Sequence, residues 1–229
     1  MQKPELDMLL NEYYNCFHDS LQQGGIQGFG QRVMNAKLES YWDSCKPQTT
    51  LEIGFGNGFH LRAVKDWPTQ IYIGLDKRII PIKDRINLEN SKLVTVEGDI
   101  HGLPFPDGSI DRILMTCIFH HLENPYGAAC EISRVLHRQG EVSILLPTDP
   151  GIINRFIKYF TVHRKAKKYK NYDSRTIYAL DHRNHIHSLL QILNYVFDED
   201  SIKVHYFPFS FLRSWNLNLF VIVRISRSA

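Results

Sequence analysis

The chain is poor in cysteine, and its cysteines are far apart in the sequence. Four occur among 229 residues, at Cys16, Cys45, Cys117 and Cys130. No two of them form a C-x-x-C pair, the spacing that is typical of structural zinc sites and of redox motifs. This pattern disfavours a zinc site and a disulfide framework, and it fits a reducing compartment.

Long apolar runs are also missing. No stretch approaches the ~20 residues that a membrane-spanning helix needs, and residues 1–7 contain acids and lack the apolar core of a signal peptide. Hydrophobic residues make up 43% of the chain and charged residues 22%, which is ordinary for a globular protein. We therefore expect a cytoplasmic protein, with residues 1–229 forming a single domain and no transmembrane segment.

Acidic residues are absent from the segment 155–170, which is strongly basic. Because the whole chain carries a formal charge of +3, the seven basic residues of this segment leave −4 for the rest. Phe156, Tyr159 and Phe160 are interleaved with them. A solvated helix face is one interpretation; contact with a phosphate-bearing substrate, an anionic membrane surface or RNA is the other. The seven residues are Arg155, Lys158, Arg164, Lys165, Lys167, Lys168 and Lys170.

Glycine, by contrast, recurs at alternate positions directly after an apolar run. The run Thr50–Ile53 is followed by Gly54, Gly56 and Gly58. Glycine is needed where the backbone turns with positive φ or where a ligand lies against bare main chain. The dinucleotide fingerprint G-x-G-x-x-G would require glycine at position 59, where Phe59 stands. This difference disfavours a nicotinamide oxidoreductase.

Two further strand-like runs end in acids. The run 71–75 stops at Asp76, and the run 93–98 stops at Asp99. A carboxylate at the tip of the second strand of a βαβ unit can accept both hydroxyls of an adenosine ribose. An ordinary tight turn without a ligand is the alternative explanation of the glycines, and the two acids in register with them disfavour it.

The pattern acid-x-G-x-G-x-G over 52–58 resembles motif I of the class I S-adenosylmethionine (SAM) dependent methyltransferases. The segment LPFPDGSIDRILMTCIFHHLENP over 103–125 resembles the quinone and sterol methyltransferase branch. The resemblance covers residues 48–147 and implies SAM as cofactor, with S-adenosylhomocysteine as product. It implies that Asp99 accepts a hydrogen bond from the adenine amino group and that Glu52 lies near the methionine amino group. The cofactor-binding residues that we expect are Glu52, Gly54, Gly56, Gly58, Asp76, Lys77, Asp99, Ile100 and Thr116.

The order of elements predicts an α/β fold. Residues 48–147 alternate strand and helix, which predicts a SAM-binding core built on a parallel sheet. Within this core, Asn124 and Pro125 open a helix that Gly140 ends, and residues 141–146 form the fifth strand. Residues 1–47 predict a cap of two helices around a loop at 22–28. Residues 148–197 predict an acceptor lid, irregular at first and helical from about 174, and 198–229 predict a strand pair. The resemblance implies a Rossmann-like sheet of seven strands, mostly parallel, with helices on both faces and an antiparallel C-terminal strand.

Histidines supply the candidate catalytic groups. His120 and His121 come just after the fourth expected strand, residues 112–116, near the expected methyl donor, where one could orient an acceptor or serve as a base. A purely structural packing role is the alternative. His182 and His185 are three residues apart, so they would share a helix face as some metal ligands do. No third ligand has a suitable spacing, and we therefore expect no metal and treat this pair as acceptor contacts, together with Arg155 and Arg164.

These features favour a SAM-dependent methyltransferase that acts on an O, N or C atom of a small-molecule, lipid or sugar-type acceptor. Phosphorylated and lipid-linked acceptors fit the basic segment, and peripheral membrane contact through 155–170 is part of this hypothesis. Two alternatives stay open: a non-catalytic SAM-binding regulatory or scaffold protein, and an RNA methyltransferase that uses the basic segment. Residues 115–118 lack the Asn-Pro-Pro-Tyr type of motif of amino-methylating DNA enzymes, so nucleic acid is disfavoured without being excluded.

Overall fold

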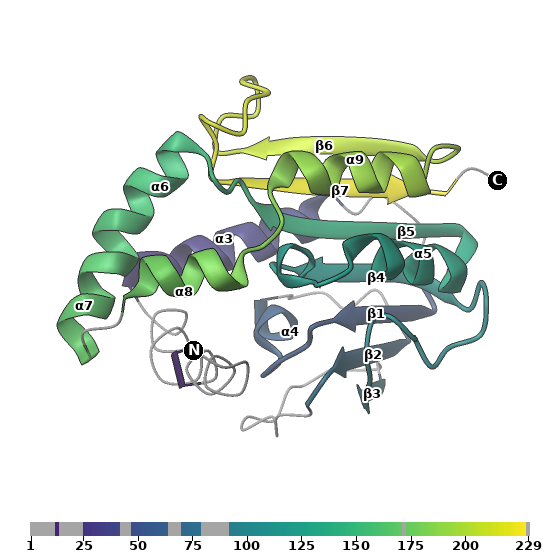
Figure 1. Cartoon of the computed structure of the whole chain (residues 1–229). Coiled ribbons are helices and arrows are strands. Elements are labelled where there is room, and N and C mark those ends of the chain that lie inside the picture. The colour runs from purple at the N-terminus through teal and green to yellow at the C-terminus, as the bar shows by residue number, and fades with distance from the viewer. Residues whose placement is uncertain are drawn as a thin grey trace.

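The computed structural model describes residues 12–13, 25–41, 47–63, 70–78, 92–170 and 173–227, and Figure 1 shows the chain. Seven strands of this part form one sheet in the order β3-β2-β1-β4-β5-β7-β6. β1 to β5 pair in parallel, and β7 runs antiparallel to both β5 and β6. The predicted Rossmann-like sheet with an antiparallel C-terminal strand is therefore confirmed. The strands are β1 Thr49–Ile53, β2 Ile71–Asp76, β3 Lys92–Glu97, β4 Ile110–Thr116, β5 Leu136–Pro147, β6 Ser201–Phe207 and β7 Phe220–Ser226.

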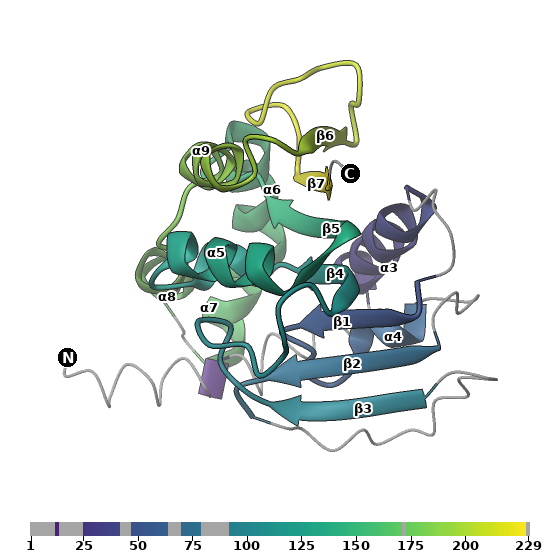
Figure 2. The same ribbon diagram turned by 90° about the vertical axis from the view of Figure 1, so that its right-hand side faces the viewer.

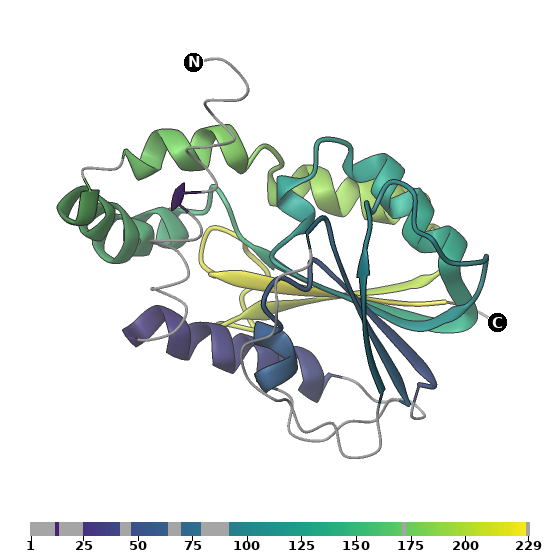
Figure 3. The same cartoon turned by 90° about the horizontal axis from the view of Figure 1, so that it is seen from below.

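Helices cover both faces of the sheet, as predicted. Figure 3 shows α3 (Gly25–Ser40) and α4 (Phe59–Ala63) on one face and α5 (Pro125–Val135) and α9 (Ile186–Val196) on the other. The remaining helices gather where the parallel strands end (Figure 1). They are α6 (Ile152–Lys158), the π-helical turn η3 (Tyr159–His163), α7 (Arg164–Lys170) and α8 (Ser174–Asp181).

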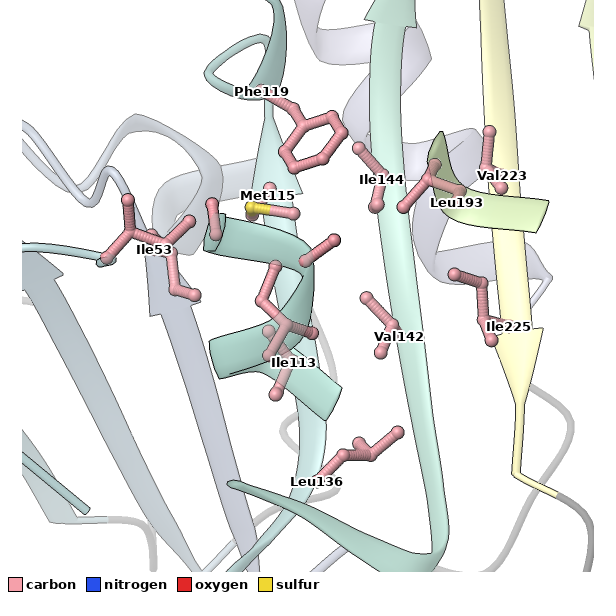
Figure 4. Close-up of a cluster of buried hydrophobic side chains, with 14 of the residues drawn as sticks. Ile53, Ile113, Met115, Phe119, Leu136, Val142, Ile144, Leu193, Val223 and Ile225 are labelled. Atoms are coloured by element: carbon pink, nitrogen blue, oxygen red, sulfur yellow. The ribbon is translucent and has the colours of Figure 1, made fainter. Parts of the chain in front are cut away.

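The larger part of the core lies between the sheet and the α5–α9 pair. Alternate residues of the central strands point to this side, because successive side chains of a strand face opposite ways. Ile113 and Met115 of β4 and Val142 and Ile144 of β5 are fully buried, and in Figure 4 Leu193 of α9 lies next to Ile144. Burying each such side chain contributes roughly 1.5–3 kcal/mol. This packing fixes the strand ends that carry the polar residues described below.

The start of α5 agrees with the sequence expectation, whereas its end and the start of β5 do not. Asn124, directly before Pro125, caps α5: its side chain accepts a hydrogen bond from Gly127 N–H. We expected the helix to end at Gly140 and the fifth strand to begin at residue 141, and both bounds are wrong. The helix ends at Val135, because Leu136 already pairs with Ile110 of β4, after which the register of the two strands shifts.

The lid also differs from its prediction. Residues 152–170 are helical throughout, not irregular, and the single helix expected from 174 to 197 is two helices. The break falls at 182–185, where Asn184 donates through its side chain to the carbonyl groups of His120 and Leu122. These contacts draw the chain out of the helix toward the end of β4.

The N-terminal cap can be judged only in part. α3 begins at Gly25, inside the loop that we expected over 22–28, because Met34 and Leu38 pack against the sheet and stabilise a longer helix than the glycines alone would favour. The first predicted helix lies almost wholly outside the described residues. Figure 2 shows α3 against the sheet from the side.

Candidate active site

The glycine loop after β1 turns through three left-handed residues. Gly54, Gly56 and Gly58 have φ angles of 77°, 52° and 71°, which a residue with a side chain adopts only at a cost. A Cβ at Gly54 would collide with the side chain of Ile118, whereas a Cβ at Gly56 would meet nothing within 4 Å. Packing therefore explains Gly54, and at Gly56 the loop faces open space in which a ligand can lie against the main chain.

Asp76, at the end of β2, is tied to this loop. Gly56 N–H donates to Asp76 Oδ2 at 2.8 Å, and Arg78 N–H donates to Oδ1 at 3.3 Å. A carboxylate offers about four acceptor positions, so these two bonds leave acceptor capacity for two hydroxyl groups. The geometry suits the predicted ribose contact.

Asp99 lies just beyond the end of β3, with Lys77 beside it. The main-chain N–H and the ring Nδ1 of His101 lie 2.9 and 2.7 Å from Asp99 Oδ1, and Lys77 Nζ lies 3.2 Å from Oδ2. The hydrogen bonds from His101 and the charge of Lys77 lower the pKa of Asp99 to about 2. Asp99 is therefore a charged acceptor at neutral pH, which is what the predicted adenine contact requires.

Of the other predicted cofactor contacts, Ile100 and Glu52 are buried and Thr116 is half-buried. Ile100 belongs to the hydrophobic core, and Thr116 is the last residue of β4. Glu52 is 1% exposed, and its Oε2 accepts a hydrogen bond from the hydroxyl of Tyr72 at 2.7 Å. Burial raises the pKa of Glu52 to about 7. Because this carboxyl group is enclosed, its predicted role near the methionine end of the cofactor would be indirect.

Three histidines meet beyond the end of β4. His120 and His121 belong to the short 3-10 turn η2 (Phe119–His121), and His182 directly follows α8. The ring centroid of His120 lies 3.9 Å from that of His121 and 4.5 Å from that of His182, and the third separation is 4.7 Å. We refer to these three residues as the histidine cluster.

The predicted pairing of His182 with His185 on one helix face is wrong. α8 ends at Asp181, and His185 is the residue that precedes α9, so the two histidines lie in the connection between the helices. His182 joins the residues after β4 instead. Nothing in the local spacing could reveal this, because the partners are about 60 residues apart in the chain.

Two carboxylates hold two rings of the cluster. His121 Nδ1 lies 2.7 Å from Asp181 Oδ2, and His182 Nδ1 lies 3.0 Å from Asp149 Oδ2. Burial lowers the pKa of His182 to about 4, although the bond to Asp149 opposes this change. Burial, followed by the neighbouring rings and Lys158, holds the pKa of His120 well below its ordinary range. His120 and His182 are therefore neutral imidazoles at neutral pH.

A pocket of about 730 Å³ opens beside His182. It lies between the residues that follow β5 and the helical segments α6, η3 and α8. Its basic lining residues include Arg155, Lys158 and Arg175, and Tyr159 and Tyr178 add aromatic surface. Because it is the candidate site for the acceptor, we refer to this space as the acceptor pocket. Such a lining suits an anion with an apolar or aromatic body.

The predicted acceptor contacts are divided between two spaces. Arg155, His182 and His185 line the acceptor pocket, whereas Arg164 lines a neighbouring hollow of about 430 Å³ together with Lys167. The structure therefore brings three of the four together and sets Arg164 apart.

Sequence reasoning missed Asp149. Its Oδ2 lies 2.5 Å from Lys158 Nζ as well as 3.0 Å from the ring of His182. Burial on its own would raise the pKa of Asp149, but the hydrogen bond from His182 and the charge of Lys158 lower it to about 2. The available signal was its position: Asp149 follows an apolar strand just as Asp76 and Asp99 do.

The turn that presents the cluster begins with an unusual backbone conformation. Cys117, directly after β4, has a φ of 56°, which a residue other than glycine seldom adopts. Strain of this kind is concentrated at functional sites and is held in place by the surrounding structure. Here it redirects the chain from β4 into η2.

Comparison with known proteins agrees with this geometry. Residues 51–144 match the family model described as "Methyltransferase domain". A 106-residue stretch is 35% identical to an uncharacterized 37.1 kDa protein in a transposon of Streptomyces fradiae; it spans 44% of this chain but only 30% of that relative's length.

Solved structures show the same fold. A SAM-dependent methyltransferase from Archaeoglobus fulgidus is 17% identical, with a TM-score of 0.61 over 93% of this chain and 99% of its own. Haemonchus contortus phosphoethanolamine N-methyltransferase 2, in complex with SAM, is 13% identical, with a TM-score of 0.62 over 96% of this chain and 60% of its own.

Residues 51–144 therefore carry a methyltransferase domain, on a fold that solved SAM-dependent methyltransferases share. The predicted methyltransferase domain is confirmed for residues 51–144, and this match supports the predicted cofactor, SAM. As for membranes, none of the helices in the described part of the chain combines the length and the apolar character that crossing a bilayer requires.

Proposed function

We propose that the chain transfers the methyl group of SAM to a small anionic molecule bound in the acceptor pocket. The observation that carries this proposal is the position of that pocket. It opens next to Asp149, directly beyond β5, and its lining includes Arg155, Lys158 and Arg175. In open α/β sheets, ligands lie beyond the carboxyl ends of the strands, which is where the glycine loop also lies.

The cofactor would lie across the ends of β1, β2 and β3. Its methionine end would rest on the loop at Gly56, its ribose on Asp76 and its adenine near Asp99. Methyl transfer requires the acceptor atom, the methyl carbon and the sulfur to be in line and shielded from water. Because Ile118 packs on Gly54, the residues that follow it, including His120, are held close to the methyl donor.

The acceptor would be an anion with an apolar or aromatic body, for which a phosphate or carboxylate group supplies the charge. The guanidinium of Arg175 lies 5.3 Å from the ring centre of Tyr159, which orients it at the pocket surface. The resemblance of 103–125 to quinone and sterol methyltransferases supports the apolar body. The acceptor atom stays open among oxygen, nitrogen and carbon.

A peripheral membrane contact is a second candidate function, because apolar and basic side chains adjoin on the lid. Ile152 and Phe156 are both 66% exposed, and Arg164, Lys165 and Lys167 follow on α7. The 208–219 loop, with the exposed Phe211, contacts the start of α6 through the bond from Ile153 N–H to the Asn216 carbonyl. Such a surface suits delivery of a lipid-linked acceptor.

The test has two stages. Calorimetric titration with SAM, S-adenosylhomocysteine and NADH should show binding of the first two alone. Candidate acceptors are then offered with SAM in matched pairs, with and without a phosphate or carboxylate group, and S-adenosylhomocysteine release is measured. We expect turnover only with the anionic members, and a loss of turnover in the Arg155→Gln/Arg175→Gln double variant.

Arg138→Gln, an exposed change on β5, is the matched control. Binding of NADH in place of SAM would overturn the proposal. SAM binding without release of product from any acceptor would favour the regulatory alternative, and turnover of RNA in place of small anions would favour the RNA methyltransferase.

A further inference from the structure

We propose that His120, His121 and His182 bind one divalent transition-metal ion of the Zn²⁺ class at the edge of the acceptor pocket. The binding itself is independent of methyl transfer, whereas its use in catalysis rests on the proposed function. Three imidazoles are a common ligand set for such an ion and leave one coordination position open.

The distances between the rings suit this site. One ligand nitrogen from each of the three histidines lies within 4.8 Å of the other two. In a tetrahedral zinc site with Zn–N distances of ~2.0–2.1 Å, ligand nitrogens are separated by roughly 3.4 Å. Rotations of the side chains would have to close the remaining gap. The backbone is already fixed, since Asn184 bonds the carbonyl of His120 through both its main chain and its side chain.

Two of the rings have a carboxylate at Nδ1, which is the arrangement that metal-binding histidines favour. Asp181 holds Nδ1 of His121, and Asp149 holds Nδ1 of His182. A carboxylate on Nδ1 keeps the proton there, so it directs Nε2 to the metal and makes it a better ligand. Both carboxylates also supply negative charge near the ion, and Asp149 is itself fixed by Lys158.

The third ring carries an unsatisfied nitrogen. His120 is 3% exposed, and among the described residues its Nδ1 has no hydrogen-bond partner. A buried polar atom without a partner costs about 1–3 kcal/mol. A metal ion coordinated by this nitrogen would remove that cost. Packing of the three rings without an ion would leave that cost in place.

The position of the site indicates what the ion would do. His182 lines the acceptor pocket, and His120 lies two residues after Ile118, which packs on the glycine loop. An acceptor hydroxyl bound to the ion would lose its proton to solvent more readily. Its oxygen would then form the new bond to the methyl carbon, while the C–S bond of the sulfonium breaks and its electron pair returns to sulfur. The acceptor class would be an alcohol or phenol that also carries an anionic group.

The test uses the full chain without an affinity tag, because a histidine tag would bind the same ions. After treatment with a chelator and its removal, the protein is titrated calorimetrically with Zn²⁺ and, separately, with Co²⁺ while the visible spectrum is followed. We expect one Zn²⁺ per chain at micromolar affinity or tighter, with the absorption of tetrahedral Co²⁺. His121→Ala and His182→Ala should each weaken binding by at least tenfold, and Asp149→Asn by about 10–100-fold.

His187→Ala is the matched control, since His187 is exposed on α9 and outside the cluster. Absence of Zn²⁺ binding by the wild-type protein would overturn the proposal, as would binding that persists in both His121→Ala and His182→Ala. SAM titration of the same samples separates the two proposals. A protein that binds SAM but no metal contradicts only the metal site, and one that binds metal but no SAM contradicts only the methyltransferase function.

Discussion

Glu39, near the end of α3, accepts two hydrogen bonds from the guanidinium of Arg112 on β4. Nη1 lies 3.0 Å from Oε2, and Nη2 lies 2.7 Å from Oε1. His60 of α4 adds a contact to Glu39 Oε1 at 2.9 Å. These residues join α3 and α4 to the face of the sheet opposite the main core.

Glu39→Gln should destabilise the protein by about 3–5 kcal/mol at pH 7, because it removes the carboxylate charge that faces the buried guanidinium of Arg112. Burial alone would raise the pKa of Glu39, but the bond with His60 and the charge of Arg112 lower it to about 2. A depressed carboxyl pKa gives stability that is present above about 4.5 and is lost as the pH falls toward 2.

The check is urea denaturation of both proteins from pH 7 down to pH 2.5. The difference between them should shrink below pH 4.5. Glu123→Gln removes an exposed pair with Arg183 and should cost less than about 1 kcal/mol. Equal losses of unfolding free energy in Glu39→Gln and Glu123→Gln would contradict a stabilising role for the buried pair of Glu39 and Arg112.

Glu52 should affect the pH dependence of the unfolding free energy in the sense opposite to Glu39, and Glu52→Gln should remove this effect. Burial raises the pKa of Glu52 from 4.5 to about 7, so its contribution is fully present below pH 4.5 and is lost as the pH rises through 7. Over that window the wild-type protein should lose about 3 kcal/mol relative to the variant. Glutamine keeps an acceptor for the hydroxyl of Tyr72 and carries no charge. Parallel curves of unfolding free energy from pH 4.5 to 8 would contradict the shift.

Asp76→Ala should weaken SAM binding by a few kcal/mol, because it removes the charged acceptor of the ribose hydroxyls. Asp76→Asn keeps an acceptor for Gly56 N–H and should lose less, which separates the ribose contact from the loop contact. Calorimetry with SAM measures both variants against Asp107→Ala, an exposed acid paired with Arg134. Unchanged affinity in Asp76→Ala would remove the ribose assignment.

Replacing Arg164, Lys165 and Lys167 with glutamine should reduce association with anionic vesicles by tenfold or more and leave SAM affinity unchanged. Each charge near an anionic surface contributes about 1 kcal/mol. Co-sedimentation with vesicles containing phosphatidylserine, compared with phosphatidylcholine alone, provides the measurement. If wild-type protein sediments with neither, the basic segment is a solvated face.

Much of the core was predictable because its signals are local. The apolar runs that end at Ile53, Asp76 and Thr116 have the length of strands, and the acids at their ends identify the edge at which a ligand lies. The capping role of Asn124 could also be predicted, because a side-chain acceptor directly before proline is typical of a helix start.

The rest depended on contacts between distant residues. The approach of His182 to His120 is set by Asn184 and Asp149, which no periodicity reveals. The early start of β5 follows from a pairing with Ile110 across a register shift. In each case tertiary contacts decided the outcome where local preference was weak.

The collision that a side chain at Gly54 would make with Ile118 has an evolutionary consequence. A side chain at 54 would occupy the volume that Ile118 now fills. Among descendants of this sequence, a side chain at 54 should therefore appear only together with a smaller residue at 118, and seldom, because the left-handed backbone at 54 disfavours any side chain. A change in the glycine loop would then require a change in the turn after β4, so the two segments would evolve together.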